Sequence, residues 1–233
     1  MKKTLLLASL AFAATLQLSS AADITGKVTL KGTPPPEKPM DVIKKDAGCG
    51  KLITEVPKTR FYVVGENAEL ADVVVSLKGI SGKSTGAQEK PLLLDQIKCE
   101  YVPYVAAVQT KQKILVRNSD PVFHNVHPTP TVPGNPEANK AQMPKAPDLE
   151  FAFNNPENFL RYKCDVHPWM FAYVSIFDHP YFAVTGQDGT FTIKNVPPGK
   201  YTIEANHRKG GIVTQEIEVK DSNVTADFVI EAK

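Results

Sequence analysis

The chain has 233 residues, of which 42% are hydrophobic and 22% are charged, an ordinary balance for one large or two small globular domains. Its 27 Lys and Arg nearly match its 25 Asp and Glu, and no basic stripe marks it as a nucleic-acid-binding protein. The 19 prolines argue against long helices, and short alternating segments between Gly, Pro, Asn and Asp predict an all-β fold.

The first 22 residues have the three-part pattern of a secretory signal peptide. Two lysines precede an apolar run at 5–18, and small residues at 19–22 offer a cleavage site. We expect a periplasmic or secreted bacterial protein that begins near Ala22 or Asp23, with an uncleaved membrane anchor as the alternative. The apolar run is too short for a comfortable membrane span, and nothing later approaches one, so an integral membrane protein is not expected.

Alternating segments predict the strands that follow. Two are expected in the N-terminal part, at 24–32 and 70–79, before a polar stretch at 81–90. The next part of the chain supplies enough short strands for a small Greek-key sandwich, at 104–107, 113–117, 151–153, 159–163 and 172–177.

Residues 128–147 contain six prolines. Because proline lacks the backbone N–H and fixes φ, this stretch is expected to form neither strand ladders nor a helix. It predicts a stiff surface loop, which either acts as a lid or partner contact or merely connects two strands.

The most specific pattern pairs a distant histidine, His124, with the spacing Cys-x-x-His-x-x-Met at 164–170. One thiolate and two imidazoles, with a weak axial thioether, form the donor set that suits copper in both oxidation states. Taken singly, the cysteine could be a disulfide partner and the methionine a core residue. For the set as a whole, zinc or an empty site is the alternative to copper. The predicted metal ligands are therefore His124, Cys164, His167 and Met170.

The three other histidines are not expected to be ligands. His127 lies three positions after His124, so in an extended segment it faces the other way, toward the surface or the core. His179 is expected to cap or bridge two domains. His207 is expected in a solvent-exposed turn.

The segment 118–127 and the loop 164–170 resemble the copper-binding halves of the cupredoxins, the blue copper proteins of the amicyanin and plastocyanin kind. The resemblance covers roughly residues 90–178. It implies that Asn125 ties the first ligand strand to the cysteine loop. It also implies one copper ion per chain, Cu(I) or Cu(II), held by His124, Cys164, His167 and Met170.

The chain has only three cysteines. An oxidising compartment favours pairing two and leaving one. If Cys164 binds copper, Cys49 and Cys99 remain for each other, with two free buried thiols as the alternative.

After residue 178 the pattern becomes a meander of hairpins, with turns at 187–189 and 195–199 and further strands at 213–219 and 224–230. The Asp-Gly-x-Phe and Pro-x-Gly-x-Tyr turns are similar to those of the carboxypeptidase regulatory-like, or transthyretin-like, β-sandwich, whose early Gly-x-Val strand resembles 24–28.

The expected fold is thus a Greek-key cupredoxin sandwich combined with a second, transthyretin-like sandwich. Its parts are a signal peptide at 1–22, an N-terminal β segment at 23–88 that packs with the C-terminal sandwich, a copper domain at 89–178 and the C-terminal sandwich at 179–233.

An electron carrier is the expected function, not an enzyme. Four filled ligand positions leave no place for a substrate, and no catalytic motif is present. The resemblance implies that electrons pass through an exposed edge of His167, in an apolar landing patch of Pro168, Trp169 and Phe171 for a redox protein of unknown identity. Packing of Trp169 inward is the alternative. Two other functions stay open: a copper-holding or scavenging protein, and a surface module whose β-sandwich binds cell-surface glycans or other proteins while the copper is structural.

Overall fold

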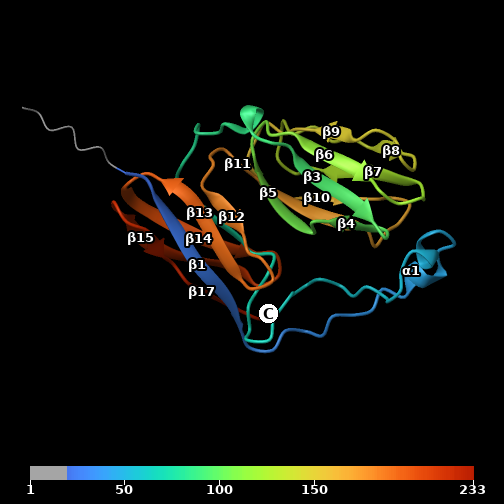
Figure 1. The fold of residues 1–233 in the computed structure, drawn as a ribbon, viewed down its shortest axis with the longest axis horizontal. Helices are drawn as coiled ribbons and strands as arrows, with labels where there is room; N and C mark the ends of the chain where they lie inside the picture. Colours follow the sequence, from blue (N-terminus) through green and yellow to red (C-terminus); the bar gives the residue numbers. More distant parts are fainter. Residues whose placement is uncertain (1–19) are drawn as a thin grey trace, which may run out of the picture.

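The computed structural model describes residues 20–233 and consists of two β-sandwiches joined side by side (Figure 1). The all-β prediction with two sandwiches is confirmed. The predicted signal peptide falls, for residues 1–19, outside the described part of the chain. Within residues 20–233 no helix is both long and apolar enough to cross a membrane.

The first sandwich has two sheets. One runs in the order β5-β11-β10-β7-β8, with bounds Val105–Gln109, Phe171–Phe177, Glu157–Lys163, His124–Thr129 and Lys140–Gln142. The other runs β4-β3-β6-β9, with bounds Glu100–Val102, Leu92–Ile97, Ile114–Asn118 and Leu149–Phe151.

Alternating side chains explain this packing. In β6, Ile114 and Val116 are fully buried while the residues between and after them are not, and in β10 Leu160 and Tyr162 do the same. Side chains two apart share one face of a strand, so both strands turn an apolar face to a single core. Each such aliphatic side chain stabilises the fold by about 1.5–3 kcal/mol. The core therefore fixes the strands whose ends carry the candidate ligands.

The second sandwich is closed by the N-terminal strand. Strand β1 (Ala22–Lys31) lies between β13 (Thr190–Val196) on one side and β16 (Val224–Thr225) and β17 (Phe228–Glu231) on the other. The facing sheet has the order β12-β2-β14-β15, with bounds Phe182–Val184, Val74–Leu77, Gly199–His207 and Gly211–Val219. The first sandwich is thus inserted between the strands of the second.

Residues 38–59 leave the second sandwich and lie against the first; we call them the strap (Figure 1). Its outgoing and returning limbs pair, since the N–H of Met40 donates to Pro57 O at 2.8 Å. Its tip carries α1 (Val42–Lys45) and η1 (Cys49–Lys51). Ile43 and Cys49 are fully buried in the core of the first sandwich. The expectation that all of 23–88 packs with the C-terminal sandwich is wrong for this segment, because its apolar tip and its cysteine belong to the other core.

The predicted Cys49–Cys99 disulfide is confirmed. Cys164 is the free cysteine, and it is buried. The bond fastens the tip of the strap to the turn between β3 and β4, directly beside the candidate ligands.

The proline-rich stretch departs from its prediction. Strand β8, within 128–147, pairs with β7 from His124↔Gln142 to Val126↔Lys140, so the expected absence of strand pairing is wrong. The reason is the spacing of the prolines: residues 137–143 contain none, and their N–H groups are free to join a ladder.

The prediction for His207 is also wrong. It is 3% exposed and packs on Tyr62, with ring centroids 4.9 Å apart. Its Nδ1 accepts the N–H of Gly210 at 2.9 Å, so the β14–β15 turn folds over it. His179 is buried between Phe177 of β11 and Phe182 of β12, at the junction of the two sandwiches, as expected.

Candidate metal centre

Three of the four predicted ligands have their donor atoms in one cluster. His124 Nδ1 lies 2.9 Å from His167 Nδ1, and Cys164 Sγ lies 3.7 Å from the same atom of His167. All three donor atoms lie within 4.8 Å of one another. Bonds of about 2.0–2.3 Å from nitrogen and sulfur would let one ion contact all three. The cluster is therefore of a size that one first-row metal ion fits.

The strands bring these residues together. His124 begins β7, and Cys164 follows the last residue of β10, which pairs with β7 through Lys163↔His127. The loop from β10 to β11 carries the remaining candidates. It closes on itself, since Met170 N donates to His167 O at 2.9 Å and Cys164 N donates to Met170 O at 3.1 Å. Met170 is 1% exposed, in the same core as Cys164.

Asn125 fastens the loop to β7. Its Oδ1 accepts the N–H of Asp165 at 2.7 Å and lies 3.2 Å from Cys164 Sγ, and its own N–H points at that sulfur at 3.5 Å. Hydrogen bonds of this kind orient metal ligands and tune the metal. Asn125 thus ties the ligand strand to the cysteine loop, the role that the resemblance implied.

The site favours a thiolate. Burial raises the pKa of the Cys164 thiol, but the neighbouring His124 side chain and the N–H groups of Asn125, His167 and Val166 outweigh it, so the pKa lies below its usual value. A thiolate is the form that binds metals. The donor set therefore suits a soft or borderline metal ion.

Each imidazole has a carboxylate behind it that the sequence analysis did not find. Asp120 Oδ2 lies 3.0 Å from His124 Nε2, and Asp46 Oδ2 lies 3.8 Å from His167 Nε2. Burial lowers the pKa of His124, yet Asp120 and Cys164 raise it more, so it stands above its ordinary value. Burial and the neighbouring His124 lower the pKa of His167. Asp120 stands four residues before His124, which was the available signal; nothing in the sequence marks Asp46.

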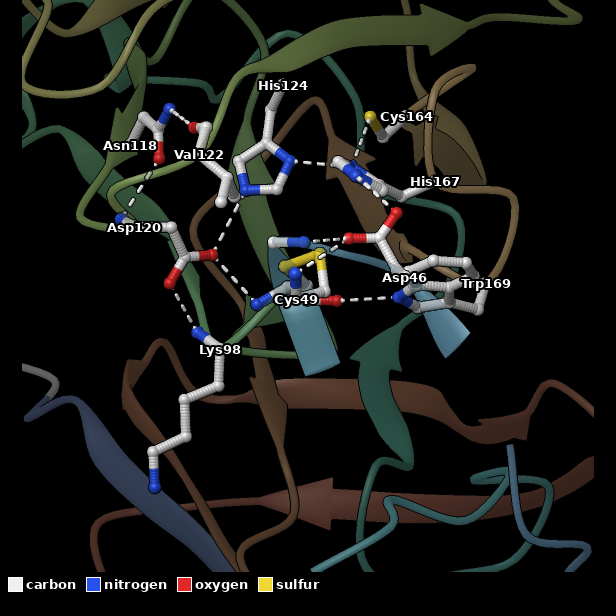
Figure 2. Close-up of a disulfide and its surroundings, with 12 residues drawn as sticks. Asp46, Cys49, Lys98, Asn118, Asp120, Val122, His124, Cys164, His167 and Trp169 are labelled. Atoms are coloured by element: carbon white, nitrogen blue, oxygen red, sulfur yellow. Dashed lines mark hydrogen bonds and ion pairs between the residues drawn. A yellow bond between two sulfur atoms is a disulfide. The ribbon is translucent and has the colours of Figure 1, made fainter. Parts of the chain in front are cut away.

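The exposed edge expected for His167 is not there. The residue is 5% exposed, and the strap covers it (Figure 2). Trp169 packs against the core of the first sandwich, and its Nε1 donates to Cys99 O at 3.2 Å. Phe171 packs on Tyr104 at the junction of the sandwiches. The apolar patch is therefore not arranged around an exposed edge of His167. Pro168 remains exposed, and Phe171 is half-buried. Trp169 is half-buried with its Nε1 turned inward, as in the alternative.

Among residues 20–233, the other groups of possible donors do not form a second centre. His127 lies outside the cluster and bonds Asp165 at 2.7 Å and Glu137 at 2.8 Å. Two further three-residue groupings in the described chain reuse His124 or His167 together with Cys49 or Cys99. Those cysteines are bonded to each other and offer no thiolate. The one cluster with a thiol is His124, Cys164 and His167.

Comparison with protein families matches the C-terminal part of the chain. A family model described as the second β-sandwich domain of BOS complex subunit NOMO1-like proteins matches residues 181–231. No curated protein matches the chain. The matched residues belong to the second sandwich. The family model describes a β-sandwich, as expected, but it is not the carboxypeptidase regulatory-like module that the turns resemble.

Solved structures resemble part of this chain. A reduced amicyanin variant is 21% identical over 44% of this chain and 97% of its own, with a TM-score of 0.34. A second reduced amicyanin variant is 20% identical over the same shares, also with a TM-score of 0.34. A Cu-containing nitrite reductase from Thermus scotoductus SA-01 is 15% identical over 39% of this chain but only 23% of its own, with a TM-score of 0.34. In each case the likeness is partial, with under half of this chain covered.

Proposed function

We propose that the first sandwich binds one copper ion through His124, Cys164, His167 and Met170, and that the exported protein carries single electrons between redox partners. The observation that carries the proposal is the convergence of two Nδ1 atoms and one thiol sulfur on one point inside the core. Two imidazoles, a thiolate and a weak thioether suit copper in both oxidation states. Copper, when bound, supplies a one-electron couple.

The chain's contribution is to hold the donors still. Cys164 and Met170 are each 1% exposed and His124 is fully buried, so packing fixes their positions and excludes water. Asn125 and the backbone bonds of the loop fix its shape. A site that keeps its geometry has little to rearrange when the charge of the ion changes. The same burial leaves no open ligand position for a substrate, which supports a carrier and not an enzyme.

The second candidate is a copper-holding protein. It is favoured by the cover over His167, since a site closed by a disulfide-bonded strap suits retention of an ion. The two functions differ in kinetics. A carrier exchanges electrons rapidly with a small redox reagent and keeps its copper in both states, whereas a holding protein exchanges electrons slowly and hands copper reversibly to a chelator.

Adding Cu(II) to the metal-free protein tests the ligand set. We expect an intense visible band from thiolate-to-copper charge transfer, absent in Cys164→Ser. Met170→Leu should keep copper bound and raise the reduction potential, because the axial thioether is a weak ligand. His127→Ala is the matched control, because this histidine lies on the same strand outside the cluster. An unchanged band in Cys164→Ser would remove the cysteine from the site.

Export is the remaining part of the proposal. Sequencing the N-terminus of the exported protein should find residue 22 or 23. The second sandwich, which matches a β-sandwich family model, is the part proposed to contact a cell-surface or protein partner. A pull-down that compares wild type with a variant substituted in the second sandwich tests this contact and leaves the metal site unchanged.

A further inference from the structure

The two histidines of the cluster are held in the same way at Nε2, the ring nitrogen that faces away from the cluster. Each ring turns Nδ1 to the cluster and Nε2 to a carboxylate, His124 to Asp120 at 3.0 Å and His167 to Asp46 at 3.8 Å (Figure 2). The first is a hydrogen bond, and the second is a longer polar contact.

Both carboxylates are held by the disulfide turns. Asp120 accepts the N–H of Lys98 at 2.6 Å and of Cys99 at 2.8 Å. Asp46 accepts the N–H of Gly48 at 2.9 Å and of Cys49 at 2.7 Å. Each carboxylate is therefore bonded to the backbone of one half-cystine and of the residue before it (Figure 2).

The backbone of the turn at Lys98 and Cys99 suits it to hold Asp120. Lys98 and Cys99 have φ of 53° and 58°, in the left-handed region that side chains rarely adopt. Successive N–H groups in such turns form a concavity that binds anions. Asp120, which is 4% exposed, fills it, and its own N–H is fixed on Asn118 Oδ1 at 3.0 Å. A buried carboxylate so bonded has little freedom to move away from His124.

The space around the strap tip is equally tight. A Cβ on Gly48 would lie 2.6 Å from Val122 Cγ1, so the turn that holds Asp46 fits closely against the residues that precede His124. Gly50 is as restricted, since a Cβ there would lie 2.6 Å from Lys44 O. The strap tip is therefore closely packed against the first sandwich at Gly48, with no room for a larger side chain there or at Gly50.

We propose that Asp120 and Asp46 are positioning residues of the metal centre and that the Cys49–Cys99 disulfide clamps them behind the two imidazoles. Asp120 keeps the ring proton of His124 on Nε2 and leaves the Nδ1 lone pair for the ion, as carboxylates commonly do behind metal-bound histidines. Asp46 restrains His167 more weakly, in keeping with its longer contact. The inference rests on the proposed function only in taking the two histidines as ligands.

The first experiment needs no metal. Long-range proton–nitrogen NMR of the metal-free protein, at a pH where the rings are neutral, shows which ring nitrogen carries the proton. We expect His124 of the wild type to hold it on Nε2. Asp120→Ala should give a mixture of both tautomers, and Cys49→Ala/Cys99→Ala should shift His124 in the same direction by a smaller amount. Asp46→Ala should change the signals of His167.

Glu157→Gln is the matched control. Glu157 is a carboxylate of the same sandwich, 5% exposed and bonded to Thr131 and Asn135, but it touches neither histidine. Its variant should leave both rings unchanged. If Asp120→Ala does not fold, Asp120→Leu, which has nearly the same shape and no acceptor oxygen, takes its place.

Copper affinity is the second readout. Loss of a hydrogen-bond partner behind a ligand costs about 10–100-fold in metal affinity, and we expect a loss in that range for Asp120→Ala and none for Glu157→Gln. An Nε2-protonated His124 that persists in folded Asp120 variants would overturn the proposal. Because this ring signal is read without metal, a protein that bound no copper would refute the proposed function while leaving this inference to be decided separately.

Discussion

Removal of the disulfide should cost the protein a large share of its stability. In Cys49→Ala/Cys99→Ala the unfolded chain regains the freedom of a loop whose ends are 50 residues apart. For that length the chain-entropy relation gives about 4 kcal/mol at 25 °C. Since a domain is commonly stable by only about 5–15 kcal/mol, such a loss brings the first sandwich near its limit.

Denaturant unfolding of the metal-free wild type and variant measures this free energy. Reduced and alkylated wild type is the second form of the same perturbation and should lose a similar amount. The free thiol of Cys164, 1% exposed, reports the strap directly, because alkylation in native buffer should be faster once the strap is no longer tied down. A loss below about 1 kcal/mol, with Cys164 as unreactive as before, would refute the reasoning, because the strap would then be held by packing alone.

Three other substitutions have clear expectations. Burial lowers the pKa of His207 from its ordinary 6.5 to about 4, so between these values the unfolded chain binds a proton that the folded chain does not. The free energy of unfolding is therefore highest above pH 6.5 and falls by about 3 kcal/mol toward pH 4. In His207→Gln this fall should disappear from the pH profile, and an equal slope in wild type and variant would contradict the expectation. Tyr162→Phe should keep or raise the thermal midpoint, because the buried hydroxyl has no partner among residues 20–233, and a loss above about 1 kcal/mol would show that it is satisfied. Gly26→Ala should cost about 1–3 kcal/mol by denaturant unfolding, since its Cβ would meet Ala226 O and the Phe191 ring, and a neutral effect would mean that β1 shifts freely.

The sequence predicted the elements that depend on local pattern. Alternation placed the strands around Ile114 and Leu160, and the spacing of Cys164, His167 and Met170 placed three candidates on one loop. Cysteine counting predicted the disulfide. These signals succeed because side-chain period and ligand spacing are properties of a few adjacent residues.

The rest depends on contacts between distant segments. No local sequence pattern near residue 46 indicates that Asp46 Oδ2 lies 3.8 Å from His167 Nε2. That contact requires the whole strap to cross to the other sandwich. The inward position of Trp169 likewise depends on a distant segment, because its Nε1 donates to Cys99 O. His207 looked like a turn residue because it adjoins a hairpin turn, but Tyr62, from a distant segment, covers it. Sequence reasoning fails where burial is provided by a segment with no local pattern of its own.

The position of β1 has a consequence for the order of folding. Its partners β16 and β17 lie about two hundred positions further along, whereas the first sandwich contains all its strands by residue 177. Pairing over such a separation is slow, because a long loop must close before any contact is made. During synthesis, which begins at the N-terminus, the inserted sandwich can assemble before the partner strands of β1 are available. The last residues of the chain then complete the second sandwich around its first strand.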